Sequence, residues 1–545
     1  MSPRKFRRLR WLGVVLTAAL AAGTAACSAD SSTSQGGTTN PTFVYAAAGV
    51  PAGLDVWKHY EGDASRLVMY EWASTLVEFD ANKVAGGGCD RLADASNLSP
   101  RLAEKWDYSP DRKQLLFTLR QGVQSPAGNA MTAQDVVWTL DRANKLSNVA
   151  RFLMFDVAKF DKTKPFEAKD DRTVAVNLTQ PTSLDVAIFT YPMLGVIDST
   201  EAKKNANGEE WAETYLATAM PNFGPWKLDQ LQPSSQIDLS PNPNFWDKAN
   251  RGNLGKLVIR SVPDASTRLQ LVETGQADYA ERLSFDQYTQ VDKSDRAQLI
   301  NCVSPNRDTL MLNQKSGPFT DPNVRKAISM AIDRQALVTG VYKGLFKPAT
   351  TGLSEVYWTP GPDAKKFEFD PEQAKTLLQQ AGVGNLSFEI LASPTRPGAY
   401  AQSLAVQIQN MLKNVGVTAS VKVIPGATEF SDTYFKGNYQ GVIYLEPPAV
   451  GDPFYSLNLY NTTVSFQNSF GYNNKQYDEL VAKVLTTAPG PDRDALLAQA
   501  SDLIVETTPQ VYLVEQRYLH ALGANVQGYQ NTPTGQLFTY RMKKG

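Results

Sequence analysis

The sequence between residues 386 and 424 switches from strand to helix periodicity and back, and this switch limits the folds open to the chain. Residues 386–391 suit a strand, and residues 404–415 place apolar side chains at helical spacing. Residues 420–424 return to a strand pattern. A strand, a helix and a second strand in this order make an α/β unit. Since no repeat of roughly 20–50 residues is visible, we expect an α/β protein rather than a solenoid.

Further helices are predicted from capping residues and from periodicity. Residues 321–322 and 370–371 are both Asp-Pro, an order in which the Asp side chain caps a helix and the proline fits its first turn. Apolar residues at helical spacing predict a helix over residues 64–79, and Gly275 is expected to end a helix that begins at Ala265. Helices and strands therefore alternate along most of the chain.

Residues 1–26 have the organisation of a secretory signal peptide. A basic start is followed by an apolar segment over residues 11–22, which is shorter than the roughly 20 residues that a membrane-spanning helix needs. Small residues then precede Cys27 in a pattern that resembles the bacterial lipobox, with Thr24 where a Leu is usual. The resemblance implies a lipid on Cys27, and ordinary cleavage beside an incidental cysteine is the alternative. Residues 27–41 are rich in Ser, Thr and Gly and are expected to form a flexible tether. We therefore predict a protein anchored at the outer face of the cytoplasmic membrane, which is the periplasmic side in a two-membrane cell.

Composition and missing motifs argue against several classes of function. The formal net charge is −1 and no basic stripe is present, so nucleic acid is not an expected partner. The chain has 2 His and 3 Cys, without HExxH or paired CxxC, so neither a metal site nor a cofactor is expected. It also has no GxSxG, GxxxxGK[ST] or GxGxxG motif. We therefore do not expect an enzyme.

Cys89 and Cys302 are the two cysteines beyond the predicted leader. In an oxidising compartment two such cysteines can form a disulfide. The sequence leaves this pairing open, because it does not show whether the Cα atoms approach within roughly 7 Å.

Four blocks of sequence carry a family resemblance. Residues 102–142 read LAEKWDYSPDRKQLLFTLRQGVQSPAGNAMTAQDVVWTLDR, and three more blocks follow in order: GPWKL with NPNFWD, IRSVPDASTRLQLVETGQADYA, and LNQKSGPFTDPNVRKAISMAIDRQALV. Their order and spacing resemble the family 5 extracytoplasmic solute-binding proteins, the peptide/nickel/opine group that serves ABC importers. The resemblance covers nearly the whole chain from residue 43 onward.

The resemblance implies a three-lobed α/β fold of the periplasmic-binding-protein type. Lobe I would contain residues 42–80, 215–303 and 515–545, an inserted lobe would contain residues 81–214, and lobe II would contain residues 304–514. The ligand would lie in a cleft between the lobes, which close on it, and the ABC permease subunits would recognise the closed form. A monomer is expected.

Residues 441–455 are the first place to look for the ligand. An apolar run that suits a buried strand ends in a Pro/Gly loop with carboxylates at Glu446 and Asp452. In α/β folds ligands bind beyond the carboxyl ends of strands. The two carboxylates also fit acid–base catalysis in a secreted hydrolase, or simply a polar turn. The residues alone leave these alternatives open.

The family resemblance assigns two charged anchors. In its dipeptide-binding members an Arg holds the ligand's carboxylate and an Asp holds its ammonium group. Arg396 matches the first anchor, and a guanidinium suits a buried carboxylate. Ala449 stands at the position of the second anchor, so the side chain is missing there. Glu446 is expected to replace it if the ligand carries an ammonium group, whereas Asp452 is expected to cap the following turn more than to touch ligand.

Aromatic residues complete the predicted ligand site. Tyr444 ends the strand and Tyr400 ends the loop that carries Arg396, while Tyr70 and Trp72 match a Tyr-Glu segment that the family has near its cleft. Core packing explains Tyr444 equally well, and helix packing explains Tyr70 and Trp72.

We therefore predict a substrate-binding lipoprotein of an ABC importer that captures dipeptides or oligopeptides without chemistry. A non-peptide solute such as an opine, a sugar or a metal chelate is the alternative within the same fold. Outside this class, the alternatives are the secreted hydrolase and a pheromone receptor that does not import.

Overall fold

The computed structural model describes residues 40–58, 63–84, 89–448 and 450–545, all within the unit 40–545. The predicted signal peptide, Cys27, most of the predicted tether and Ala449 lie outside the described residues. Within the described ranges, no helix has the length and apolar character needed to cross a membrane. The same ranges contain no group of three or more His, Cys, Asp or Glu residues arranged to hold a metal ion.

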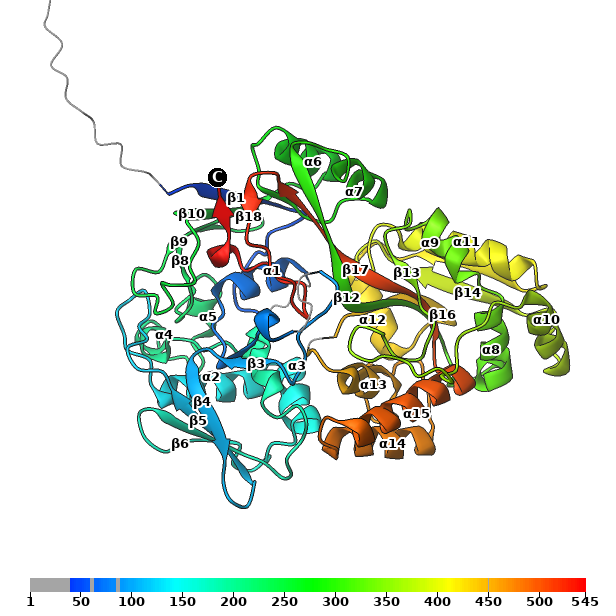
Figure 1. Cartoon of the computed structure of the whole chain (residues 1–545), viewed down its shortest axis with the longest axis horizontal. Helices are drawn as coiled ribbons and strands as arrows, with labels where there is room; N and C mark the ends of the chain where they lie inside the picture. Colours follow the sequence, from blue (N-terminus) through cyan, green and yellow to red (C-terminus); the bar gives the residue numbers. More distant parts are fainter. Residues whose placement is uncertain (1–39, 59–62, 85–88, 449) are drawn as a thin grey trace, which may run out of the picture. The chain divides into compact units, whose positions relative to one another are not determined.

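One large mixed sheet organises the described chain. Its strand order is β15-β14-β16-β12-β17-β11-β1-β10-β9-β8, with β13 paired to β17 off this path. Strands β12 (Ala297–Leu312) and β17 (Val511–Gly523) are much longer than the others and pair antiparallel. Figure 1 shows this green and red pair running from the part that contains β1 to the part that contains β14 and β16. The other strands are β1 Thr42–Ala47, β8 Trp226–Gln232, β9 Gln236–Pro241, β10 Lys256–Ser261, β11 Tyr279–Ala280, β13 Lys347–Pro348, β14 Ser387–Ala392, β15 Thr418–Val423 and β16 Gly441–Glu446.

The unit predicted between residues 386 and 424 is present at one edge of this sheet. Strand β14 pairs in parallel with both β15 and β16, and helix α11 packs against β14 and β15. Parallel neighbours need such a helical crossover, which explains why the strand and helix patterns alternate in this part of the sequence. Strand β16 is buried along almost its whole length because it lies between β14 and β12, which accounts for its continuous apolar run.

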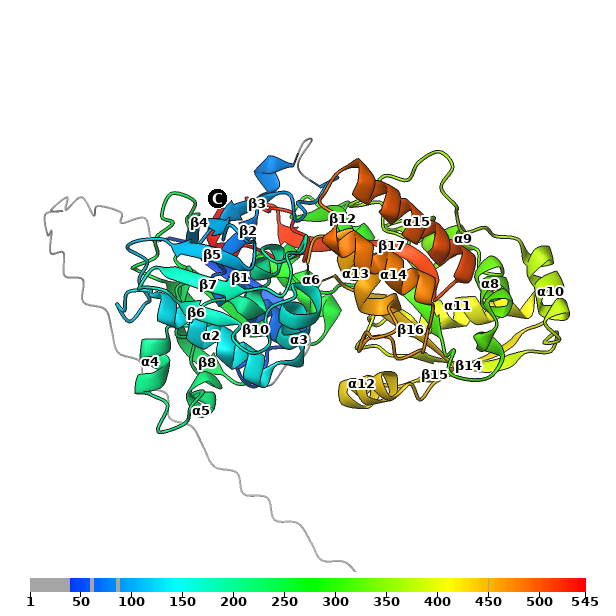
Figure 2. The same ribbon diagram turned by 90° about the horizontal axis from the view of Figure 1, so that it is seen from below.

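A second, smaller sheet lies within residues 81–214, the range predicted for the inserted lobe. Its strand order is β4-β5-β7-β6, and helix α2 packs against β6 and β7. Figure 2 shows this sheet, coloured from blue to cyan, beside α2. Its strands, and those of two small two-stranded sheets, are β4 Ala103–Tyr108, β5 Gln114–Leu119, β6 Phe166–Ala168, β7 Thr173–Asn177, β2 Val77–Phe79, β3 Leu98–Pro100, β18 Val526–Gln527 and β19 Lys543–Lys544.

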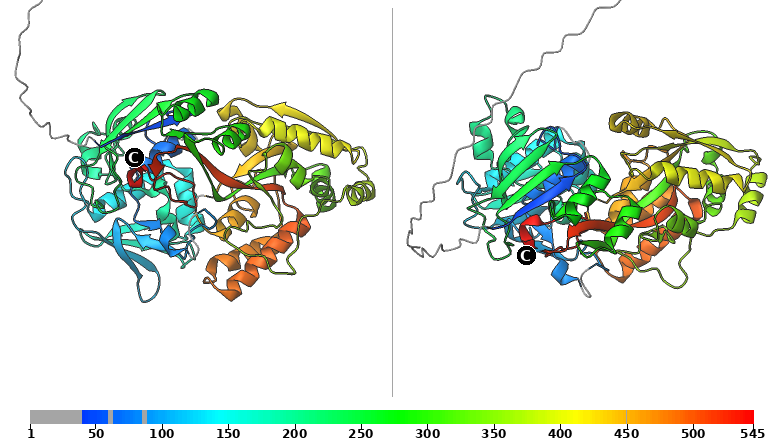
Figure 3. Two further views of the ribbon diagram at one scale, coloured as in Figure 1. Left: turned by 45° about the horizontal axis from the view of Figure 1, so that its top comes forward. Right: turned by 90° about the horizontal axis from the view of Figure 1, so that it is seen from above.

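The helices cover both sheets. Figure 3 shows the red strand β17 and its green neighbour β12 from two further directions, with the orange helices α13–α15 on one side of them. The helices are α1 Asp63–Trp72, α2 Ala133–Leu146, α3 Asn148–Arg151, α4 Ser199–Lys204, α5 Glu213–Leu216, α6 Ala265–Glu273, α7 Phe285–Val291, α8 Pro322–Met330, α9 Arg334–Gly340, α10 Pro371–Gln380, α11 Ala401–Lys413, α12 Ala427–Lys436, α13 Pro453–Asn461, α14 Lys475–Thr486 and α15 Pro491–Thr507.

The predicted helix starts are confirmed. Asp321 caps α8 and Asp370 caps α10, each by accepting a hydrogen bond from a backbone N–H of the first turn, and each is followed by a proline. Helix α6 ends at Glu273, and Gly275 follows in a left-handed conformation with φ of 72°.

The helix predicted over residues 64–79 is wrong in its second half. Helix α1 ends at Trp72, and Val77–Phe79 forms strand β2 instead. The carbonyl groups of Thr75 and Leu76 accept hydrogen bonds from the backbone of residues 101–103. These long-range partners replace the helical ones, and helical spacing in the sequence gives no sign of them.

Cys89 and Cys302 form a disulfide with a Cα–Cα distance of 4.1 Å. A backbone hydrogen bond of 2.7 Å from Val303 N to the Cys89 carbonyl runs beside it. The covalent link therefore joins strand β12 to the segment that precedes the smaller sheet.

Candidate functional site

Arg396 lies in the loop between β14 and α11, against the end of β16. Its Nη2 donates a 3.1 Å hydrogen bond to the carbonyl of Leu445, and its guanidinium carbon lies 4.4 Å from the ring centroid of Tyr444. The side chain is half-buried. The loop after one parallel strand thus places a cation across the carboxyl end of its neighbour, where α/β folds bind ligands.

Tyr444 is the middle layer of a stack. Its ring is nearly parallel to that of Tyr434 in α12, with an interplanar angle of 7° and centroids 4.0 Å apart. Arg396 and Tyr434 approach the ring too closely to share one face, so they lie on opposite faces of Tyr444. The ring is buried, and burial raises the pKa of its hydroxyl while the charge of Arg396 opposes this shift. The guanidinium therefore makes a cation–π contact with a ring that is itself packed on Tyr434.

Helix α1 contributes a second arginine nearby. Arg66 donates a 3.2 Å hydrogen bond from Nη2 to the hydroxyl of Tyr70. Burial raises the pKa of Tyr191, Tyr70 raises it further, and both Arg66 and Arg396 lower it. Both guanidinium groups therefore act electrostatically on the phenol of Tyr191. The predicted ligand contact of Tyr70 stays a prediction.

Trp72 is buried in the hydrophobic core, with its ring centroid 6.0 Å from that of Trp57. Its indole N–H makes no hydrogen bond to any described residue. A ligand contact by Trp72 stays a prediction, because the packing observed here is what a structural role requires.

Tyr400 is held by strands β12 and β17. Its hydroxyl lies 2.8 and 3.1 Å from the two carboxylate oxygens of Asp308, and Gln516 Nε2 donates a 2.8 Å hydrogen bond to it. The hydroxyl therefore has protein partners, and the predicted ligand contact of Tyr400 stays a prediction.

Glu446 lies inside the sheet, where it is opposite Arg307 in the β12–β16 register. Its Oε1 accepts a hydrogen bond from Gln510 Nε2. Burial raises the pKa of Glu446 to about 8, against the lowering effects of Arg307 and Gln510. Arg307 itself pairs at 2.9 Å with Glu515. A carboxyl group with this pKa is mostly protonated at neutral pH, which does not favour the pairing with a ligand ammonium group that was predicted for it.

Asp452 is the N-cap of α13. Its Oδ1 accepts a 2.8 Å hydrogen bond from the backbone N–H of Phe454, and its two oxygens lie 2.7 and 3.1 Å from the guanidinium of Arg493. Arg493 also donates a 3.2 Å hydrogen bond to Ser183. These contacts give Asp452 a structural role at the junction of α13 and α15, and they engage both oxygens that a hydrolytic pair would need.

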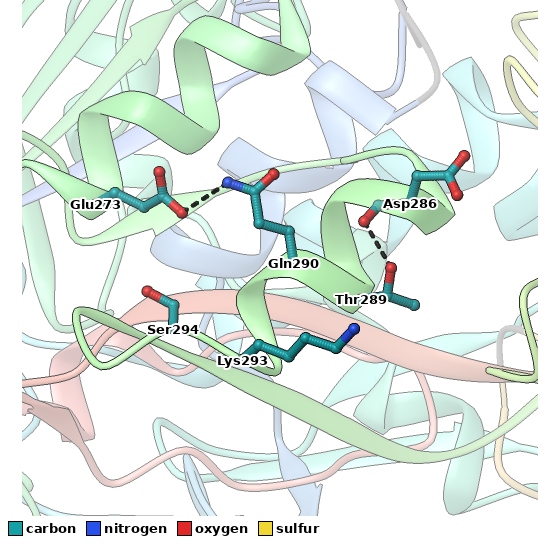
Figure 4. Close-up of a pocket in the computed structure, with 6 residues that line it drawn as sticks. All are labelled: Glu273, Asp286, Thr289, Gln290, Lys293 and Ser294. Atoms are coloured by element: carbon teal, nitrogen blue, oxygen red, sulfur yellow. Dashed lines mark hydrogen bonds between the residues drawn. The ribbon is translucent and has the colours of Figure 1, made fainter.

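A surface pocket of about 430 Å³ lies elsewhere, beside helices α6 and α7. Figure 4 shows its polar lining, in which Gln290 donates a 3.1 Å hydrogen bond to Glu273 and Thr289 donates a 2.7 Å hydrogen bond to the carbonyl of Asp286. None of the predicted ligand residues lines this pocket. It is therefore separate from the site around Arg396.

The sequence analysis did not consider Tyr434, Tyr191 or Asp308. For Tyr434 a signal existed, because Phe430 and Tyr434 are four residues apart and place two rings on one face of α12. The partners of Asp308 lie 34, 92 and 208 residues away in the sequence, and those of Tyr191 are also distant, so a local pattern carries no information about them.

The family comparison matches residues 97–468 to the model described as bacterial extracellular solute-binding proteins, family 5 middle. The glutathione-binding protein GsiB of Shigella flexneri is 26% identical over 494 residues, which cover 88% of this chain and 93% of that protein. The probable D,D-dipeptide-binding periplasmic protein DdpA of Escherichia coli (strain K12) is 24% identical over 443 residues, which cover 81% of this chain and 83% of that protein.

Among solved structures, the ABC transporter-associated periplasmic binding protein DppA from Helicobacter pylori in complex with the peptide STSA superimposes with a TM-score of 0.79. The match is 22% identical and covers 92% of this chain and 98% of that one. The predicted α/β fold of the periplasmic-binding-protein type is confirmed.

Proposed function

Because the chain belongs to the bacterial extracellular solute-binding proteins of family 5, as predicted, we propose that it captures a peptide or peptide-like solute for an ABC importer. The relatives named for glutathione and for D,D-dipeptides support a peptide-like ligand. The association of a similar solved protein with an ABC transporter supports the importer. The solute is bound and released unchanged, and its binding stabilises a closed form that the permease subunits recognise.

The placement of Arg396 is the observation that carries this proposal. The guanidinium lies over the ring of Tyr444 at the end of β16 and donates a hydrogen bond to the Leu445 carbonyl. A planar guanidinium offers paired N–H donors that match the two oxygens of a carboxylate. The ligand on this proposal has a free carboxylate that Arg396 holds.

The second anchor limits the ligand further. Ala449 has no charged side chain, and Glu446 has a pKa of about 8 because of burial. Neither residue provides a strong negative charge for an ammonium group at neutral pH. We therefore expect the carboxylate, rather than the ammonium group of a free dipeptide, to dominate recognition. Opines and metal chelates that carry a carboxylate remain compatible with the same anchor.

The protein's location is part of the proposal. Residues 1–26 direct export, the lipid on Cys27 anchors the mature chain, and residues 27–41 form the tether of a monomeric receptor at the outer face of the cytoplasmic membrane. The three-lobe arrangement with boundaries near residues 81, 215, 304 and 515 belongs to the same proposal.

Mass spectrometry of the small molecules that copurify with the protein tests the ligand class, and calorimetry with the molecule found then tests the anchor. The expected result is a molecule with a free carboxylate whose affinity falls in Arg396→Ala and is retained in Arg296→Ala, a control on an exposed arginine of the turn before β12. A bound molecule without any acidic group, or equal affinity in both variants, would falsify the carboxylate anchor. Formation of a reaction product would contradict the non-catalytic role.

A further inference from the structure

The loop that carries Arg396 is fixed at its other end by Tyr400. Only Pro397, Gly398 and Ala399 separate the two residues, and Tyr400 is the residue before α11. Gly398 lies against the ring of Tyr400, since a Cβ atom on Gly398 would be 3.0 Å from a ring carbon. The position of the Tyr400 ring therefore constrains the backbone next to Arg396.

Asp308 of strand β12 holds the Tyr400 hydroxyl. The Asp308 side chain is fully buried, and Oδ2 accepts hydrogen bonds of 2.8 Å from both Tyr342 and Tyr400. Oδ1 accepts a 2.8 Å hydrogen bond from Gln516 Nε2. Within the described residues, no lysine or arginine makes a salt bridge to this carboxylate.

Aromatic packing completes the attachment. The ring of Tyr400 lies 5.1 Å from Phe285 and 5.5 Å from Tyr342, centroid to centroid. Phe285 begins helix α7, and Tyr342 follows α9. These rings shield the hydrogen bonds of Asp308 from water, which strengthens them. Besides its hydrogen bond to Asp308 of β12, Tyr400 therefore has contacts with three other parts of the chain, at Phe285, Tyr342 and Gln516.

A buried carboxylate that has only neutral donors is costly. Burial raises the pKa of Asp308 to about 7, although the hydrogen bonds from Tyr342, Tyr400 and Gln516 lower it. An asparagine or an apolar side chain would avoid this cost. A carboxylate accepts several strong hydrogen bonds at once, so the arrangement suits a residue whose task is to fix the hydroxyl of Tyr400.

We propose that Asp308 and Tyr400 are positioning residues that set where Arg396 lies on Tyr444, and therefore how it meets the ligand carboxylate. Neither residue needs to touch ligand. The ligand half of this statement rests on the proposed function, whereas the placement of Arg396 does not.

Two matched variants separate positioning from general stability. Tyr400→Phe and Tyr342→Phe each remove one hydroxyl from Asp308, but only Tyr400 belongs to the Arg396 loop. Phenylglyoxal, which modifies arginine side chains, is the probe, and the modification rate at Arg396 is followed by peptide mass spectrometry. We expect the modification rate at Arg396 to change several-fold in Tyr400→Phe. In Tyr342→Phe we expect this rate to equal that of the wild-type protein.

The proposal would be overturned if the modification rate at Arg396 were the same in Tyr400→Phe as in the wild-type protein. It would also be overturned if Tyr400→Phe and Tyr342→Phe changed this rate equally. Gly398→Ala provides a second route, because its new methyl group would lie 3.0 Å from the Tyr400 ring and its φ of 156° strains an alanine, so the variant disturbs the loop and leaves Asp308 intact. It is expected to change the same rate. Unfolding curves of all three variants show whether each is folded.

Protection by ligand distinguishes this proposal from the proposed function. Glutathione and its C-terminal glycine amide are added in separate reactions with phenylglyoxal. If neither protects Arg396 and the rates still differ between Tyr400→Phe and Tyr342→Phe, the positioning role stands and a peptide carboxylate at Arg396 is contradicted for this ligand. If glutathione protects Arg396 from phenylglyoxal and the amide does not, the result supports a peptide carboxylate at Arg396, and the difference in rate between the two variants supports the positioning role.

Discussion

Arg396 lies on the face of Tyr444 with its guanidinium carbon 4.4 Å from the ring centroid, and Tyr434 covers the opposite face. This relationship joins a loop after β14, the end of β16 and helix α12. It gives the proposed ligand anchor a fixed orientation before any solute arrives, which lowers the entropy that binding must offset.

Tyr444→Leu should weaken binding of the copurified solute. Leucine keeps an apolar side chain but removes the aromatic face under Arg396, a contact worth about 0.5–2 kcal/mol. Calorimetry measures the loss. Phe430→Leu is the control, because Phe430 also stacks near Tyr444, at 6.4 Å, but on the helix that carries Tyr434. Equal losses in the two variants would show that the general packing matters and the cation–ring contact does not.

Glu446→Gln should flatten the pH dependence of stability. The pKa of Glu446 is about 8 in the folded protein against an ordinary value of 4.5, so the folded protein binds this proton more tightly than the unfolded chain does. Stability therefore falls as the pH rises from 4.5 to about 8. Glutamine cannot ionise, and its carbonyl still accepts the hydrogen bond from Gln510. Urea unfolding across this pH range measures how steeply the free energy of unfolding falls with pH. Glu368→Gln, on the surface, is the control. If the free energy of unfolding falls with pH as steeply in Glu446→Gln as in the wild-type protein, the raised pKa of the buried Glu446 is contradicted.

Arg493→Met should destabilise the protein by about 3–5 kcal/mol, because it leaves the buried carboxylate of Asp452 without its cation. Adding Asp452→Asn should restore part of this loss, since asparagine also caps helices and carries no charge. Urea unfolding of the single and double variants measures both effects. If the double variant is no more stable than Arg493→Met, the buried charge is not the cause.

Cys27→Ser should release the protein from the membrane if the cysteine carries a lipid. Cell fractionation and intact mass of the mature protein measure this, and Ser28→Ala is the matched control beside it. A membrane-bound Cys27→Ser protein, or a mature mass without lipid in the unmodified protein, would contradict the anchor.

The sequence predicted the edge of the large sheet well and its centre poorly. The unit at residues 386–424 and the strand at 441–446 follow from local patterns of apolar residues, although the burial of β16 also depends on β12, which is distant in the sequence. Strand β12 contains Arg307 and Asp308, both buried, and polar residues in such positions do not suggest a central strand. Their partners come from residues 342–352, 400 and 512–516, which only the folded chain brings together.

The ligand contacts assigned from the sequence stay predictions, and the structure adds neighbouring residues that the sequence analysis did not consider. Arg396 and Tyr444 are in contact, as neighbouring elements of one predicted region. Tyr434, which stacks on Tyr444, is 10 residues from it in the sequence, whereas Asp308, which accepts a hydrogen bond from Tyr400, is 92 residues from it. The sequence therefore indicated which cation to consider, while the contact of Tyr400 with Asp308 depends on packing between distant parts of the chain.

The register of β12 and β17 has a structural consequence. Val303 pairs with Arg517 and Arg307 pairs with Glu515, so three residues of β12 face Gln516 alone. The ladder of paired residues is interrupted there, as at a β-bulge. Gln516 also donates a hydrogen bond to the hydroxyl of Tyr400. The interruption in the pairing of the two long strands therefore adjoins the residue that ends the Arg396 loop.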